Sequence, residues 1–266
     1  MDKDKIQKVV RDAYGKIAQG QECCGCGSCG PDAMEFAKSL GYSGKELEDI
    51  PKGANLSLSC GNPIALANLR EGEVVLDLGS GAGFDCFLAA ARVGREGKVI
   101  GVDMTPEMIE KARDNARKNN ITNVEFRVGE IENLPVADNS IDVVISNCVI
   151  SLSTDKPRVF QDVYRVLKPN GRIAISDMAL LKKLPENIHK SMEAYIECVA
   201  GALLVDEYEE IAEQSGLKDV TLTIKKSAAC IDPNTTNPIS RATLDGLGEN
   251  ESLEEYVVSV DVEGYK

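Results

Sequence analysis

The sequence predicts an α/β fold with a doubly wound, mostly parallel sheet and helices on both of its faces. Apolar, strand-like runs alternate with helix-like segments through the middle of the chain, as expected where crossover helices connect parallel strands. The β-branched run at 73–78 leads directly into a glycine turn at 79–83, and a helix-like segment follows. The 266 residues leave room for one such domain with further segments at both ends.

Before the sheet, the pattern predicts helices on either side of a cysteine-rich loop. Gly20 ends the first helix, and Asn62 with Pro63 provides an N-cap and a first turn for the last one. The loop contains too much glycine for a helix or a strand. The predicted elements of this part are helices over 3–18, 33–40 and 64–69 and a loop over 23–31.

In the core, predicted strands and helices follow one another in regular alternation. Thr105 as cap, Pro106 at the first position and Glu107 in the first turn mark the start of the second core helix. The predicted core strands are 73–78, 98–103, 124–128, 141–146 and 171–177, and the predicted core helices are 83–93, 106–119 and 156–167.

After the core, the sequence predicts a mixed C-terminal part whose strands extend the sheet or form a small subdomain of their own. The predicted elements there are helices over 186–200 and 206–215, strands over 220–224 and 256–262, and a loop over 231–253. We therefore expect three parts: an N-terminal segment (1–70), the core (71–180) and a small C-terminal α+β extension (181–266).

Composition excludes several classes of function. The chain has 30 Lys and Arg against 43 Asp and Glu, a net charge of −13, and nucleic acid is not expected as a partner because phosphate binding needs a basic surface. A charged N-terminus and the lack of a long apolar run predict neither a secretion signal nor a membrane span, and we expect a soluble cytoplasmic protein. With a single histidine, His189, which is most simply a solvated helix residue, the sequence argues against multi-histidine metal sites and histidine triads.

The charges and the glycine spacing at this turn narrow the choice of ligand. The glycines follow G-x-G-x-G rather than the dinucleotide pattern G-x-G-x-x-G, and Asp77 precedes Gly79 by two residues. A carboxylate repels a pyrophosphate but attracts an ammonium or a sulfonium. Asp103 ends the next strand, twenty residues after Gly83, where an acidic side chain can bind ribose hydroxyls. These features favour S-adenosylmethionine over the alternative of a doubly wound domain that binds another nucleotide.

From about Gly72 to Asp177, the chain resembles the class I S-adenosylmethionine-dependent methyltransferases. Leu167-Lys-Pro-Asn-Gly171 and the run that follows are similar to the turn and fifth strand of that Rossmann-like fold. In such folds the loop after the third strand faces the adenine, which selects Glu130 and Ile131. The resemblance implies that the cofactor-binding residues are Asp77, Gly79, Ser80, Gly81, Gly83, Asp103, Met104, Glu130, Ile131 and Asn147.

Three cysteines indicate the chemical class of the methyl acceptor. Cys148 follows the fourth strand, where donor and acceptor meet in this fold, and the segment offers no obvious general base. Cys148 alone is either a small buried hydrophobe or a soft ligand, and Cys60 and Cys198, which can fold over the same cleft, favour the ligand. Trivalent arsenic binds three sulfurs, keeps a lone pair and needs no base to accept a methyl group.

The segments around these thiols resemble the arsenite methyltransferase family. Asn147-Cys-Val-Ile150, Cys60-Gly-Asn-Pro63 and Cys198-Val-Ala-Gly-Ala202 carry the similarity, which spans roughly 8–225. Ser59 and Ser151 depart from the glycine and asparagine expected in relatives, and the extra C-terminal cysteine-rich region of the long form is lacking.

The arsenite methyltransferase resemblance also implies roles for single cysteines. Cys148 and Cys198 bind arsenic, and Cys60 is a third ligand or a redox partner. A cysteine of the N-terminal loop, with Cys24 as our choice, pairs with Cys60 after methylation, and thioredoxin or glutathione resets the enzyme. The implied activity is the methylation of thiol-bound arsenite for detoxification.

Alternative interpretations remain for the thiols and for the activity. Cys23, Cys24, Cys26 and Cys29 have spacings that also suit a structural zinc knuckle, while Cys86 and Cys230 are most simply packing residues. The alternative activities are a small-molecule C- or O-methyltransferase of the quinone or sterol type, which would not need Cys60 and Cys198, and a thiolate metalloid-binding protein without turnover.

Overall fold

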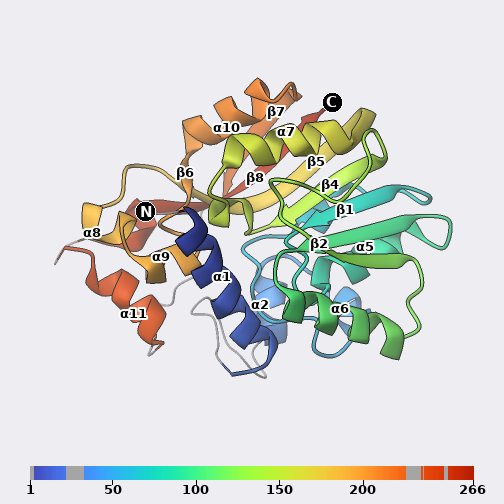
Figure 1. Cartoon of the computed structure of the whole chain (residues 1–266), viewed down its shortest axis with the longest axis horizontal. Helices are drawn as coiled ribbons and strands as arrows, with labels where there is room; N and C mark the ends of the chain where they lie inside the picture. Colours follow the sequence, from blue (N-terminus) through green and yellow to red (C-terminus); the bar gives the residue numbers. More distant parts are fainter. Residues whose placement is uncertain (1–2, 22–32, 226–234, 236, 249–250) are drawn as a thin grey trace.

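A single sheet organises the molecule (Figure 1). The computed structural model describes residues 3–21, 33–225, 235, 237–248 and 251–266. The sheet has the strand order β3-β2-β1-β4-β5-β8-β7, and the short β6 pairs with the end of β5. The strands are β1 (Val74–Leu78), β2 (Lys98–Asp103), β3 (Val124–Val128), β4 (Ile141–Asn147), β5 (Leu167–Leu180), β6 (Leu203–Leu204), β7 (Lys218–Lys225) and β8 (Val257–Tyr265).

The first five strands are parallel, and β8 runs antiparallel to both of its neighbours, β5 and β7. The carboxyl ends of β1, β2 and β4 therefore meet at one edge of the sheet, which is where doubly wound folds bind ligands. The doubly wound, mostly parallel fold is confirmed. The two C-terminal strands extend the main sheet and do not form a subdomain of their own.

Helices cover both faces of the sheet and one of its ends (Figure 1). Helices α5 and α6 lie on one face, and α7 and α10 lie on the other, while α1, α8, α9 and α11 gather beyond the carboxyl ends of the strands. The helices are α1 (Lys3–Ala18), α2 (Ala33–Ser39), α3 (Gly44–Asp49), α4 (Pro63–Ala67), α5 (Phe84–Val93), α6 (Pro106–Lys118), α7 (Lys156–Val166), α8 (Glu186–His189), α9 (Met192–Ile196), α10 (Val205–Gln214) and α11 (Pro238–Asp245). Two 3-10 turns complete the described elements, η1 (Ile150–Leu152) and η2 (Leu253–Glu255).

Each face of the sheet buries its own apolar core. On one face Phe160 of α7 packs edge-to-face on Tyr208 of α10, with ring centroids 5.8 Å apart. On the other, Phe87 of α5 packs on Phe126 of β3, also at 5.8 Å. A third cluster joins α1 and α9 to Cys60 and Cys198, so those two thiols belong to the packed end of the molecule beyond the strands.

The structure departs from the sequence prediction in several places: β5 extends beyond the predicted strand 171–177 at both ends, β6 was not anticipated, and three further departures concern helices. The helix expected over 186–200 is wrong, because Ser191 caps a new helix, so that α8 and α9 are separate and Cys198 lies in the following loop with φ +64°. The region 231–253, expected as loop, contains α11. Helix α3, capped by Ser43 and Glu46, was not anticipated. Within the described ranges, no helix is long and apolar enough to cross a membrane.

Candidate active site

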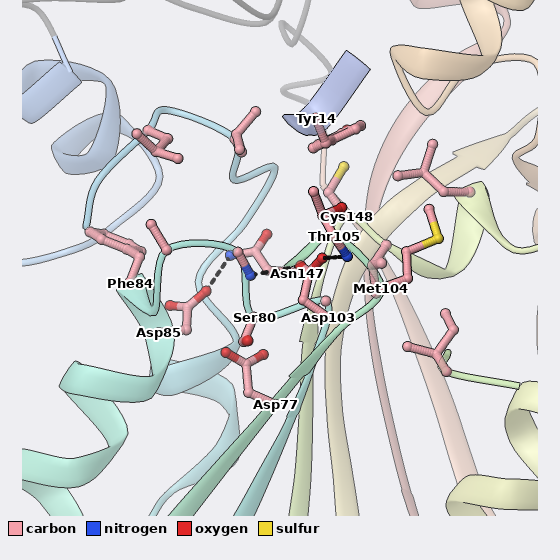
Figure 2. Close-up of a pocket in the computed structure, with 18 of the residues that line it drawn as sticks. Tyr14, Asp77, Ser80, Phe84, Asp85, Asp103, Met104, Thr105, Asn147 and Cys148 are labelled. Atoms are coloured by element: carbon pink, nitrogen blue, oxygen red, sulfur yellow. Dashed lines mark hydrogen bonds between the residues drawn. The ribbon is translucent and has the colours of Figure 1, made fainter. Parts of the chain in front are cut away.

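The glycine turn after β1 contributes residues 79–82 to the wall of a pocket at the carboxyl ends of the central strands, whereas Gly83, predicted as a cofactor residue, does not line it (Figure 2). Gly79, Gly81 and Gly83 have φ values of +66°, +50° and +93°, a region that side chains rarely adopt. A Cβ atom at Gly79 would lie 2.4 Å from Cγ2 of Val149, and one at Gly83 would lie 2.7 Å from Cε2 of Phe87. Only glycine therefore permits this turn.

Asp103 lies at the end of β2 and holds the turn in place. Its Oδ2 accepts a hydrogen bond from the backbone N–H of Gly81 at 2.9 Å, and its Oδ1 accepts one from the N–H of Thr105 at 2.8 Å. Thr105 is the N-cap of α6 as predicted, although its own side chain makes no capping bond. The carboxylate also lines the pocket, in reach of a bound nucleoside.

Changing Asp103 to Ala is expected to weaken S-adenosylmethionine binding by about 10- to 100-fold, because the ribose loses a charged acceptor and the turn loses two anchors. Isothermal titration calorimetry measures the affinity. Arsenite binding, followed by equilibrium dialysis, serves as the control and should change little. An unaltered cofactor affinity would remove Asp103 from the ribose site.

Two further acidic residues lie at the inner end of the pocket (Figure 2). Asp77 is 2% exposed, accepts a hydrogen bond from the Cys86 thiol at 3.2 Å, and has a pKa raised by burial and by the nearby Asp85 carboxylate. Asp85 lies in the first turn of α5 and is 5% exposed. Ser80 Oγ is also buried, and it has no hydrogen-bond partner among the described residues. The glycine cradle, the carboxylates and this unpaired hydroxyl fit S-adenosylmethionine.

The two residues predicted to contact the adenine, Glu130 and Ile131, lie in different environments. Ile131 is buried and lines the pocket, as does Met104. Glu130 is exposed and does not line the pocket, whereas Glu132, two residues later, does. Tyr14 of α1 closes the pocket from above, a contribution that the sequence prediction missed (Figure 2).

Cys60 and Cys148 are brought together beside this pocket. Their sulfurs and a carboxylate oxygen of Asp177 all lie within 4.8 Å of one another. Cys148 directly follows β4, has φ +57°, and donates its N–H to the Ser176 carbonyl of β5 at 2.9 Å. It also lines the pocket, so one thiol faces both the cofactor side and the thiol cluster.

Side chains from two strands, β4 and β8, hold the backbone of Cys60. Its N–H donates to Oδ1 of Asn147 at 3.0 Å, and its carbonyl accepts from the Ser259 hydroxyl of β8 at 2.8 Å. The next residue, Gly61, is so close to Ser176 that a Cβ would lie 2.4 Å from the Ser176 Cβ. Asn147, predicted as a cofactor residue, therefore also positions a thiol.

Cys198 approaches the same cluster from the loop after α9. Its Sγ lies 3.3 Å from the carbonyl oxygen of Cys148, at hydrogen-bonding distance. Tyr195 of α9 anchors this loop by donating to the Ser153 carbonyl at 3.1 Å. Gly201 packs directly against η1, since a Cβ there would lie 2.2 Å from the Ser151 carbonyl oxygen. The three described cysteines of the predicted arsenic site thus come together, while Cys24 lies outside the described residues.

Charged groups around the thiols were not predicted. Burial raises the pKa of Asp177 to about 6, although the Met178 and Ser151 amides donate to it. Burial lowers the pKa of Lys156 to about 8, and the Asp177 charge opposes this. Tyr208 donates to Asp177 at 3.2 Å. The only sequence signal for Asp177 was its position as the polar last residue of the predicted apolar strand 171–177.

Fold and pocket define a class I S-adenosylmethionine-dependent methyltransferase, and the profile of a methyltransferase domain matches residues 69–216. An arsenite methyltransferase of Halobacterium salinarum is 46% identical over 276 residues, covering 100% of this chain and 68% of that protein. The chain belongs to the arsenite methyltransferase family.

Further comparisons agree with this assignment. An arsenite methyltransferase of Aquipseudomonas alcaligenes is 36% identical, covering 82% of this chain and 63% of that protein, so this chain spans less than two thirds of its length. The crystal structure of an arsenic (III) S-adenosylmethionine methyltransferase from Chlamydomonas reinhardtii superposes with a TM-score of 0.61 at 33% identity. It covers 88% of this chain and 73% of that one.

Proposed function

We propose that the protein transfers methyl groups from S-adenosylmethionine to thiol-bound trivalent arsenic, and so detoxifies arsenite. The observation that carries the proposal is the convergence of thiols from three separate segments beside the cofactor pocket. Cys60 and Cys148 contribute sulfurs to a cluster within 4.8 Å, and Cys198 lies 3.3 Å from the Cys148 carbonyl. Convergent soft ligands suit a thiophilic substrate.

In this proposal Cys148 and Cys198 bind the arsenic, and Cys60 is a third ligand. Arsenite reaches them as a thiol conjugate and exchanges its sulfur ligands for theirs, so that each incoming thiol loses a proton and each outgoing thiolate gains one. S-adenosylmethionine, when bound, supplies an electrophilic methyl group, which arsenic accepts on its lone pair. The protein therefore needs no general base and acts mainly by holding the substrate in place.

Accepting the methyl group makes the arsenic formally pentavalent, and it must then be reduced to the trivalent state. We propose that Cys60 and a cysteine of the N-terminal loop, Cys24 in our choice, supply two electrons by forming a disulfide. Thioredoxin or glutathione would reduce that disulfide, and the reaction would take place in the cytoplasm, where thiols are kept reduced. The extension over 181–266 would then serve as the part that contributes Cys198 and covers the substrate.

The direct test incubates the reduced protein with S-adenosylmethionine, arsenite and thiol, and detects methylated arsenic by chromatography with element-specific detection. We expect monomethylated arsenic as the first product. Cofactor binding without any arsenic product would favour an organic acceptor of the quinone or sterol type. Tight arsenite binding without methyl transfer would favour a sequestering protein.

A further inference from the structure

Helix α11 lies beside α9, at the end of the molecule that contains the thiols (Figure 1). It carries two polar side chains without exposed surface, Ser240 and Thr243. Residues three apart lie on the same face of a helix, and both hydroxyls donate to the carboxylate of Glu197. The other end of α11 is held separately, because Nδ2 of Asn187 donates to the Gly246 carbonyl at 2.7 Å.

Glu197 is a buried carboxylate that ends α9 and directly precedes Cys198. It is 2% exposed, and its Oε2 accepts from the Thr243 hydroxyl at 2.8 Å while its Oε1 accepts from Ser240. Burial raises the pKa of Glu197, and within the described ranges no lysine or arginine forms an ion pair with it. An apolar side chain would pack α9 on α11 at lower cost, since a carboxylate is expensive to bury. What the carboxylate adds is a pair of directional bonds that fix the position of its own backbone.

The turn that contains Cys198 needs such support. Cys198 has φ +64°, and a backbone in this region persists only where the surrounding structure holds it. Its own N–H donates to the Tyr195 carbonyl at 3.0 Å, which closes the turn on α9 but does not tie it to another element. The Tyr14 hydroxyl of α1 donates to the Ile196 carbonyl at 3.3 Å on one side. On the other side, the hydroxyls of α11 hold Glu197.

We propose that Glu197 is a positioning residue of the arsenic site, and that its hydrogen bonds to α11 hold the turn from which Cys198 presents its sulfur toward Cys148. Helix α11, which is described throughout, contributes no residue to the cofactor pocket. Its effect on the methyl acceptor therefore passes through Glu197. The inference rests on the proposed function, because it takes Cys198 as an arsenic ligand.

The first test compares Thr243→Val with the unchanged protein. Valine has the size of threonine but leaves one oxygen of the buried Glu197 carboxylate without a donor, and the carboxylate is then expected to turn toward water and to move the Cys198 turn with it. We expect arsenite affinity, measured by equilibrium dialysis, to fall about tenfold. Affinity for S-adenosylmethionine, measured by calorimetry, should stay within about twofold. Thr243→Ser keeps the hydroxyl and should bind arsenite within about twofold of the unchanged protein.

The second test follows the position of the thiol itself. Cys198 is 4% exposed, so alkylation by iodoacetamide requires the turn to open. Peptide mass spectrometry gives its labelling rate beside that of Cys86, a fully buried thiol of α5 that serves as the internal reference. Thr243→Val should raise the rate at Cys198 about tenfold relative to Cys86.

Val93→Ala separates positioning from stability. Val93 is fully buried in α5, and its truncation destabilises the core on the far side of the sheet without touching the Cys198 turn. This variant should melt at a lower temperature and label faster at Cys86, and it should bind arsenite normally. Should Thr243→Val not fold, Ser240→Ala removes the other donor with a smaller change of shape and is expected to show the same losses.

Unchanged arsenite affinity in Thr243→Val, or a Cys198 labelling rate that rises only in step with Cys86, would overturn the role of Glu197. An equal loss of arsenite affinity in Val93→Ala would overturn it too, because the effect would then be one of stability alone. An unchanged protein that bound no arsenite would refute the proposed acceptor, and the role of Glu197 toward arsenic with it. Normal arsenite methylation by the unchanged protein and by Thr243→Val alike would refute only this inference.

Discussion

Replacing Cys148 by serine is expected to lower the rate of arsenite methylation by at least about 1,000-fold and to leave cofactor affinity within about twofold. Serine keeps the shape of the side chain but offers a hard hydroxyl in place of a soft thiolate. The backbone at this position has φ +57° and is fixed by its bond to Ser176, and neither feature depends on sulfur. The change therefore removes a ligand without disturbing the pocket wall.

Initial rates of arsenic methylation and calorimetric titration with S-adenosylmethionine measure the two effects of Cys148→Ser separately. Cys230→Ser is the matched control, since Cys230 is interpreted from its sequence context as a packing residue outside the site. Substantial turnover of arsenite by Cys148→Ser would refute the ligand role. Lost cofactor binding would instead show that Cys148 belongs mainly to the pocket.

The sheet and its glycine turn could be predicted because their signals are local. A buried parallel strand is a short apolar run, and the turn at Gly79, Gly81 and Gly83 needs residues that tolerate positive φ. The prediction of one helix over 186–200 was wrong because the apolar spacing continues through Ser191, whose side chain caps a new helix. Helix propensity alone cannot distinguish a continuous helix from two short ones that tertiary contacts separate.

At the site, the sequence was enough to predict the functional side chains but not the residues that hold them in position. Cys60, Cys148 and Cys198 were recognisable by residue type, and the structure brings them together. Asp177 and Tyr208 form part of their surroundings through contacts between strands and helices far apart in the chain, which no local pattern records. Long-range hydrogen bonds that no local pattern records also hold two other residues. Asn147 and Ser259 bond to the backbone of Cys60, and Tyr42 donates to Asp85.

Changing Gly201 to Ala is expected to separate Cys198 from Cys148 and to reduce arsenic methylation by about 100-fold. The new Cβ would lie 2.2 Å from the Ser151 carbonyl oxygen and 2.9 Å from Cε2 of Tyr195. The first contact is with backbone, which cannot turn aside as a flexible side chain can, so the Cys198 loop and η1 must move apart. Overpacking of this kind costs about 1–3 kcal/mol of the free energy of unfolding.

Because the glycine turn, Asp103 and the other acidic residues of the pocket lie on other elements, the Gly201→Ala protein should keep its affinity for S-adenosylmethionine within about fivefold while it loses arsenite affinity in equilibrium dialysis. Gly44→Ala is the matched control. Outside its chain neighbours and its own helix backbone, the nearest atom to a Cβ at Gly44 would be the flexible end of Lys38 at 3.8 Å, and alanine favours the first turn of α3. That variant should methylate arsenite normally and melt at the same or a slightly higher temperature. If Gly201→Ala retained full arsenite affinity, contact between the Cys198 loop and η1 would not be what positions the thiols, and Cys198 would have to reach arsenic from another conformation of its loop.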